Sequence, residues 1–231
     1  MRVDRYIQAL FSDLLNYQPE LYAARHTAKA SLEGLHALFT QCDIRYYAVF
    51  GTLLACIRNQ ALFSYDHDID LAIHRHDLAL FRQCLPQALS LGFRVSELGY
   101  SVIKLRSIPA DTAIDIWVIE PAPVYAIGYI WRLDHALFRR DYFSTPAQAP
   151  CYAVMMSIPQ DAHHLLADCY GPQWRVPDTT AFCVYRPVLS RVLAWPFITS
   201  VVPMRFSHDP KSCRYRPWVK AIGLDRLMTM L

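Results

Sequence analysis

The sequence predicts a mixed α/β fold, because helix and strand patterns alternate along its first half and apolar residues are plentiful. Of the 231 residues, 54% are hydrophobic and 19% are charged. This composition excludes a disordered chain, since so much apolar surface can offset the entropy lost on ordering. The 7 glycines are scattered and form neither the Rossmann nor the P-loop glycine pattern, so both of those nucleotide folds are excluded.

The expected order of elements is helix, strand, helix, strand, helix and then further strands. Apolar residues at helical spacing predict helices at 21–41 and 77–91, the second with Asp77 as N-cap and Gly92 as its stop. Thr52 is expected to cap a short helix after the first strand. Strands are predicted at 45–50, 69–73, 93–97, 101–106 and 113–120. We therefore expect a mixed sheet flanked by helices.

Proline is distributed unevenly along the chain, which suggests that the N-terminal and C-terminal parts differ in structure. Ten of the 15 prolines lie between Pro146 and Pro217. Proline interrupts helices and central strands, so the C-terminal part should have short, broken elements. We predict a catalytic core at 1–145 and an irregular subdomain at 146–231 that packs on it.

Charge and cysteine content bear on the partners and the cellular location of the protein. The 23 basic and 20 acidic residues are too balanced to predict a nucleic-acid partner. The 7 cysteines lack a C-x-x-C pair and indicate reduced thiols, hence a cytoplasmic location. The segment Val184–Met204 combines apolar stretches with arginines, which fits a peripheral contact with the inner face of a membrane. Its prolines favour a folded subdomain instead.

Four aspartates suggest a metal site. Asp66, Asp68 and Asp70 alternate, so on a strand they share one face, and Asp115 lies in a later apolar strand. Like charges this close raise each other's pKa, and an aspartate inside an apolar strand needs a donor or a metal as partner. Oxygen ligands favour Mg²⁺, with Mn²⁺ as a substitute. The simpler interpretation is a solvated turn whose carboxylates cap the next helix.

Several motifs resemble the LicD/fukutin family in sequence order. Its G-T-L-L-G-x-x-R pattern corresponds to 51–58, and its W-D-x-D-[IV]-D block to 65–70. The strand around Asp115 resembles I-D-[IV]-F, and 170–177 resembles Y-G-x-x-W-x-x-P. The chain departs from the family at Ala55, where glycine is usual, at His67, and at 59–62, which replaces a basic turn.

The resemblance implies a nucleotidyltransferase-type fold of the polymerase-β kind and an enzyme that modifies glycans. Such enzymes move phosphocholine, glycerol phosphate or ribitol phosphate from a CDP-activated donor to a glycan hydroxyl and release CMP. It implies that Asp68, Asp70 and Asp115 bind the metal and that Asp66 is an outer ligand or the general base. Gly51 and Thr52 would lie near the donor phosphates.

Three further residues are candidate substrate contacts. By the same resemblance, Arg58 would contact a donor or acceptor phosphate. Lys104 is expected either to neutralise a donor phosphate or, as the commoner case, to face solvent from an edge strand. Trp174 is suited either to stacking on a base or sugar or to packing in the core.

Two other functions stay open at this point. One is a true nucleotidyltransferase that moves NMP from an NTP to a small molecule, RNA or protein and releases pyrophosphate. The other is an inactive binding module on the same fold, which the intact Asp68, Asp70 and Asp115 disfavour.

Overall fold

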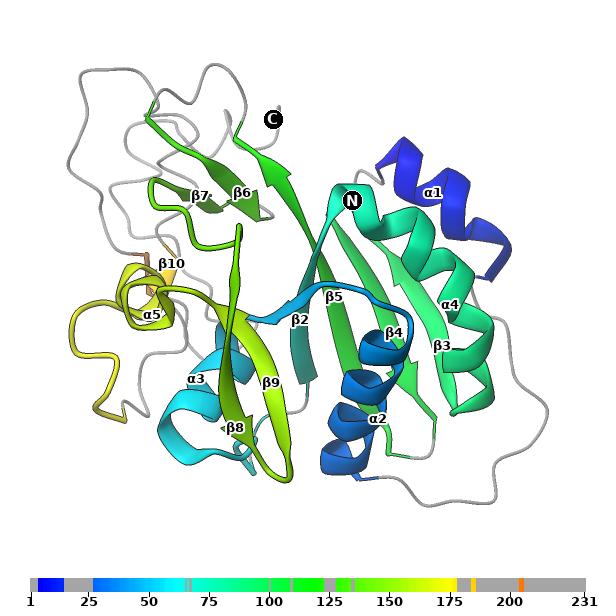
Figure 1. Ribbon diagram of the computed structural model, residues 1–231, viewed down its shortest axis with the longest axis horizontal. Coiled ribbons are helices and arrows are strands. Elements are labelled where there is room, and N and C mark those ends of the chain that lie inside the picture. The colour runs from blue at the N-terminus through cyan, green and yellow to red at the C-terminus, as the bar shows by residue number, and fades with distance from the viewer. Residues whose placement is uncertain are drawn as a thin grey trace.

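The protein is organised around a mixed β-sheet with helices packed against it (Figure 1). The computed structural model describes residues 4–14, 27–64, 66, 68–99, 101–108, 110–122, 128–133, 136–177, 184–185 and 204–205. The sheet strands are β1 (Tyr46–Ala48), β2 (Asp68–His74), β3 (Phe93–Leu98), β4 (Val102–Ser107), β5 (Thr112–Pro121), β6 (Trp131–Leu133) and β7 (Ala136–Phe138). Their main order is β1-β2-β5-β4-β3, and β6 joins β5 to β7.

The central pair, β2 and β5, is parallel, and the neighbouring pairs of the main sheet are antiparallel. A parallel pair needs a long crossover. Here the chain leaves β2, passes through a helix and the β3–β4 hairpin, and returns as β5. The mixed α/β fold class predicted from the sequence is therefore confirmed.

Helices lie on both sides of this arrangement. They are α1 (Arg5–Phe11), α2 (Ala28–Gln41), α3 (Phe50–Asn59), α4 (Leu78–Ser90) and α5 (Ala162–Tyr170), with short 3-10 turns η1 (Ser12–Leu14) and η2 (Arg75–Asp77). Figure 1 shows α1 and α4 side by side next to β3, while α3 and α5 lie at the other end of the sheet, beyond β2.

Strand alternation separates an apolar face of the sheet from a polar one. On β2 the odd-numbered residues Ile69, Leu71 and Ile73 are fully buried, whereas Asp68 and Asp70 point to the opposite face. On β5 the even-numbered Ile114 and Ile116 are also fully buried and in register with Ile69 and Leu71. Aspartates of adjacent strands thus meet on the polar face.

A hairpin from the C-terminal part packs against the N-terminal half. Its strands are β8 (Pro146–Cys151) and β9 (Val154–Pro159), and they contact α3 and β1 respectively. A separate two-stranded ladder joins β10 (Val184–Tyr185) to β11 (Met204–Arg205). The boundary at 146 stays a prediction, and most of Val184–Met204 lies outside the described residues.

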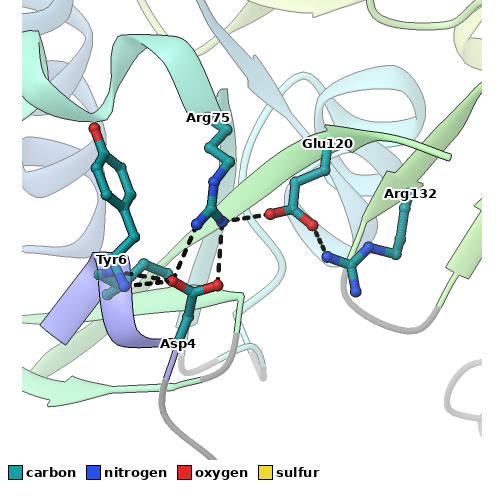
Figure 2. A network of polar contacts seen from close by, with 6 residues as sticks. Asp4, Tyr6, Arg75, Glu120 and Arg132 are labelled. Carbon is teal, nitrogen blue, oxygen red and sulfur yellow. Dashed lines mark hydrogen bonds and ion pairs between the residues drawn. The ribbon is translucent and has the colours of Figure 1, made fainter. Parts of the chain in front are cut away.

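A network of ionic contacts holds α1 against the rest of the chain (Figure 2). Asp4 is the N-cap of α1, and its carboxylate accepts hydrogen bonds from the Tyr6 and Ile7 amides. The same carboxylate contacts the Arg75 guanidinium at 3.1 Å. Arg75 also pairs with Glu120, which in turn pairs with Arg132. Figure 2 shows these four charged side chains as one continuous chain of contacts.

The structure corrects several predicted boundaries. Helix α3 begins at Phe50, which was predicted to end a strand, and its N-cap is Val49 rather than Thr52. Phe50 has φ 45°, a left-handed conformation that is uncommon for a residue with a side chain. Asp77 is the N-cap of α4 as predicted, but its side chain makes no capping hydrogen bond in the described part.

The predicted helix at 21–41 is described from Ala28, with Thr27 as its N-cap; residues 21–26 lie outside the described residues. Within the described ranges, no helix is both long enough and apolar enough to cross a bilayer.

Candidate metal and substrate site

Three aspartates meet at the centre of the polar sheet face. Asp68 and Asp70 begin β2, and Asp115 is the direct register partner of Asp70 on β5. One carboxylate oxygen from each of the three lies within 4.8 Å of the others. Oxygen ligands at this spacing suit a hard divalent cation. The strand pairing thus assembles, from two distant segments, the three carboxylates that the resemblance implies as metal ligands.

The electrostatics of the cluster favour a bound cation. Burial and the charge of Asp68 raise the pKa of Asp70 well above its usual range. Burial likewise raises the pKa of Asp115, although Lys104 opposes this. Among the described residues, the buried Oδ1 of Asp115 has no hydrogen-bond partner. Buried carboxylate oxygens normally have one, so the donor set fits a metal ion.

Lys104 faces this cluster. Its Nζ lies 2.8 Å from Oδ2 of Asp115, with which it is in register across β4 and β5. The predicted edge-strand, solvent-facing lysine is therefore wrong, because β4 lies between β3 and β5. Burial lowers the pKa of Lys104, but the hydrogen bond and charge of Asp115 outweigh it and leave the pKa raised. Lys104 is thus a cation beside the acidic cluster.

Gly51 and Asp66 lie close together at the start of α3. A Cβ on Gly51 would lie 2.8 Å from Oδ2 of Asp66 and 3.7 Å from Oδ2 of Asp70. The first distance is shorter than a real Cβ contact, so any larger residue at position 51 would force the Asp66 carboxylate to move, and glycine permits its close approach. Asp66 precedes β2, with its amide donating to the Phe63 carbonyl at 3.1 Å. It is partly exposed and stands outside the three-oxygen cluster.

Two side chains orient Asp70, and neither was predicted from the sequence to have this role. The Thr52 hydroxyl accepts a 2.8 Å hydrogen bond from the Asp70 amide, and the Trp117 indole Nε1 donates to Asp70 Oδ1 at 2.9 Å. Thr52 is fully buried, which argues against direct contact with a donor phosphate. Trp117 could have been identified by its spacing, because it lies two residues after Asp115 on the same face of a strand.

The other two predicted substrate contacts, Arg58 and Trp174, lie against other side chains of the protein. Arg58, in the last turn of α3, places its guanidinium 5.3 Å from the centre of the Phe63 ring. Trp174 is 5% exposed and belongs to the core. One side of its ring faces His163, and the Arg175 guanidinium lies 4.4 Å from its centre. This placement favours the packing interpretation of Trp174 over stacking on a base.

Two solved structures show a distant likeness to the chain. A structure of ANT(2")-Ia in complex with adenylyl-2"-tobramycin is 12% identical, with a TM-score of 0.39, and the match covers 63% of this chain and 79% of that one. Terminal uridylyl transferase 4 from Trypanosoma brucei with bound GTP is 16% identical, with a TM-score of 0.30, and the match covers 49% of this chain and 35% of that one.

Two relatives are similar in sequence over part of their length. An uncharacterized protein of Rickettsia prowazekii (strain Madrid E) is 34% identical over 90 residues, which are 38% of this chain and 32% of the relative. One of Rickettsia typhi (strain ATCC VR-144 / Wilmington) is 32% identical over 89 residues, which are 38% of this chain and 27% of that relative. The match thus spans about a third of these relatives or less.

The family comparison covers the whole polar sheet face. The model of the LicD/FKTN/FKRP nucleotidyltransferase domain matches residues 43–161, just over half of the chain. This range runs from before β1 to the start of α5 and includes all three clustered aspartates, together with Lys104. The match confirms the resemblance noted in the sequence, and the chain belongs to the LicD/FKTN/FKRP family.

Proposed function

We propose that the protein is a Mg²⁺-dependent transferase that moves a phosphoryl-alcohol from a CDP-activated donor to a glycan hydroxyl and releases CMP. The alcohol would be of the choline, glycerol or ribitol type, as the family resemblance implies. The observation that carries the proposal is the cluster of Asp68, Asp70 and Asp115, whose oxygens lie within 4.8 Å of one another inside the family's domain.

In this proposal the three clustered aspartates hold the metal. A divalent ion bound there would supply positive charge that neutralises phosphate oxygens during an in-line displacement. Trp117 and Thr52 hold Asp70 in place through its Oδ1 and its backbone amide. Lys104 adds a fixed ammonium group that can attract a donor phosphate.

Asp66 is the better candidate for the general base. Oδ2 of Asp115 is held by Lys104, and Asp115 is buried, whereas Asp66 is partly exposed and lies outside the cluster. A base must reach the hydroxyl proton of an incoming acceptor. Asp66 is partly exposed and lies beside Gly51 at the start of α3, and in this proposal it would accept that proton.

A second candidate is transfer of NMP from an NTP with release of pyrophosphate. This candidate is supported by the description of the matched family model, which is a nucleotidyltransferase domain. Both reactions would use the same carboxylates, because in both an acceptor oxygen attacks a phosphorus atom near the metal and displaces a phosphate-containing leaving group. The leaving group distinguishes them.

The test combines metal binding, donor binding and product analysis. Calorimetric titration of Mg²⁺ together with CDP-choline, CDP-glycerol or CDP-ribitol should give binding to the wild type and none to Asp68→Ala or Asp70→Asn. Incubation with a cytidine donor should release CMP, whereas NTPs should release no pyrophosphate. Release of pyrophosphate from an NTP would establish the second candidate.

If the protein bound Mn²⁺ but did not bind any cytidine nucleotide, the donor assignment would be contradicted. Absence of an anomalous Mn²⁺ peak between Asp68, Asp70 and Asp115 in soaked crystals would contradict the metal assignment and support an inactive binding module.

A further inference from the structure

Two arginines lie directly opposite each other on the polar sheet face, next to the acidic cluster. Arg94 on β3 is the register partner of Arg106 on β4, and Arg106 is in turn the partner of Ala113 on β5. The Lys104–Asp115 contact fixes which face this is, because residues two apart on a strand share a face. Arg94, Arg106 and Lys104 therefore share the face of the clustered aspartates.

Only one of these two arginines has a carboxylate partner among the described residues. Like charges directly opposite each other across two strands are destabilising. Arg106 is paired with Asp111, a turn residue that is 80% exposed. Arg94 Nε is buried and has no hydrogen-bond partner among the described residues. A buried donor that lacks a partner is costly, so an acceptor supplied by a ligand would relieve both problems.

The position suits a group that belongs to the substrate. Asp68 and Arg106 are both in register with Ala113, one from each side. Neighbouring strands are about 4.8 Å apart, so the backbones of Asp68 and Arg106 are separated by about 10 Å. On the strand between them, the residue at this level is Ala113, whose side chain is a single methyl group. A substrate phosphate can therefore extend from the carboxylate cluster to the guanidinium groups.

We propose that Arg94 and Arg106 form a subsite for a phosphate group of the substrate, beside the catalytic carboxylates. Planar guanidinium groups bind phosphate through paired hydrogen bonds. The subsite deepens the proposed function and rests on it for the identity of the substrate. The phosphate belongs either to the acceptor glycan or to the donor diphosphate.

The experiment measures anion binding directly, without turnover. Wild type, the double variant Arg94→Gln/Arg106→Gln and the control Arg139→Gln, an exposed arginine outside the polar face, are titrated with inorganic pyrophosphate in EDTA. We expect the double variant to bind at least about tenfold more weakly than the wild type, and the control to be unchanged. Equal affinity of the double variant and the wild type overturns the subsite.

Two further arms identify the source of the phosphate. The same proteins are titrated with CDP and with N-acetylglucosamine 6-phosphate. If the double variant loses affinity for CDP alone, the subsite belongs to the donor; if it loses affinity for N-acetylglucosamine 6-phosphate alone, the subsite belongs to the acceptor. Arg94→Lys/Arg106→Lys keeps the charge without the planar fork and should bind with intermediate affinity, which separates a local effect from misfolding. Because EDTA removes metal and Asp70→Asn removes a negative charge, this variant should bind pyrophosphate at least as tightly as the wild type, even if the transferase reaction itself is absent.

Discussion

Two charged clusters share strand β5 and differ in how their charges are balanced. Around Glu120, two carboxylates and two guanidinium groups alternate in a linear series, Asp4–Arg75–Glu120–Arg132 (Figure 2). Five residues earlier, Asp115 joins Asp68 and Asp70, and the described residues place one ammonium group, that of Lys104, against them. The first cluster has no net charge, whereas the second is negative.

The difference separates a structural role from a functional one. The balanced network joins four segments, the start of α1, η2, β5 and β6, so it fixes their packing. The hydrogen bonds that the cluster's carboxylates accept come from Trp117 on β5 and Lys104 on β4, which belong to the same sheet, so these bonds attach no further element to it. Its excess charge opposes folding. A site that costs stability without adding contacts is expected where a ligand supplies the missing charge.

The largest effect is expected for Asp70→Asn. The amide is isosteric and still accepts the Trp117 hydrogen bond, but it removes one carboxylate from the cluster. We expect Mg²⁺ affinity and transfer activity to fall by more than about 100-fold, beyond the effect of changing a ligand's outer partner. The thermal midpoint without metal should be unchanged or higher, because repulsion from Asp68 and Asp115 is reduced.

Calorimetry with Mg²⁺ and thermal unfolding in EDTA measure the two outcomes. A lower thermal midpoint in EDTA together with unchanged metal affinity would show that Asp70 is a structural residue.

The next largest effect is expected when the hydrogen bond from Trp117 to Asp70 is removed. Trp117→Phe keeps a ring to pack against Phe50, whose ring centre lies 5.5 Å away, but removes the indole donor to Asp70. Loss of such a partner weakens metal binding by about 10- to 100-fold. Trp131→Phe is the matched control, since its indole donates to Asp141 rather than to the cluster. Equal Mn²⁺ affinities of the two variants would contradict the role of Trp117.

Much of the fold was accessible from the sequence because strands with one buried face alternate strictly. The predicted strand at 69–73 and the observed β2 differ by one residue at each end. The start of α3 was not accessible, since Phe50 adopts a positive φ that no local pattern of side chains specifies. In the fold the Phe50 ring packs edge-on against Trp117, a tertiary contact that the local sequence does not encode.

The site was predictable to the extent that it depends on local spacing. Asp68 and Asp70 are two residues apart, but their meeting with Asp115 depends on strand order, which the sequence alone left open. Lys104 was misplaced for the same reason, because a central strand and an edge strand have similar local patterns. The Asp4–Arg75–Glu120–Arg132 network was missed, since Arg75 is 71 residues from Asp4 and 45 from Glu120.

A smaller effect, on stability alone, is expected for Glu120→Gln. It leaves Arg75 and Arg132 with one carboxylate, that of Asp4, so the network gains a net positive charge. Breaking a buried pair costs about 3–5 kcal/mol, but Arg75 is 34% exposed, so we expect about 2 kcal/mol. Urea unfolding measures the loss, and Mg²⁺ affinity should not change. A large loss of Mg²⁺ affinity would show that the two clusters are not independent.

The smallest effect concerns the exposed end of the network and depends on pH. Burial raises the pKa of Asp4, but hydrogen bonds from Arg75 and from the Ile7 and Tyr6 amides outweigh it and lower the pKa below 3.8. The folded state therefore binds this proton less tightly than the unfolded state. The stabilisation by Asp4 is complete above 3.8 and is lost as the pH falls through the lowered folded value.

Asp4→Asn isolates the charge, because asparagine is an equally good N-cap. At neutral pH and low salt we expect the variant to be about 0.5 kcal/mol less stable than the wild type in urea unfolding, since the pair with Arg75 is only partly buried. The difference should shrink with added salt and disappear at pH values well below 3.8, where both side chains are neutral. If the stability difference persists in acid, the Asp4 side chain stabilises α1 as a cap and not through its charge, and the balanced network ends at Arg75.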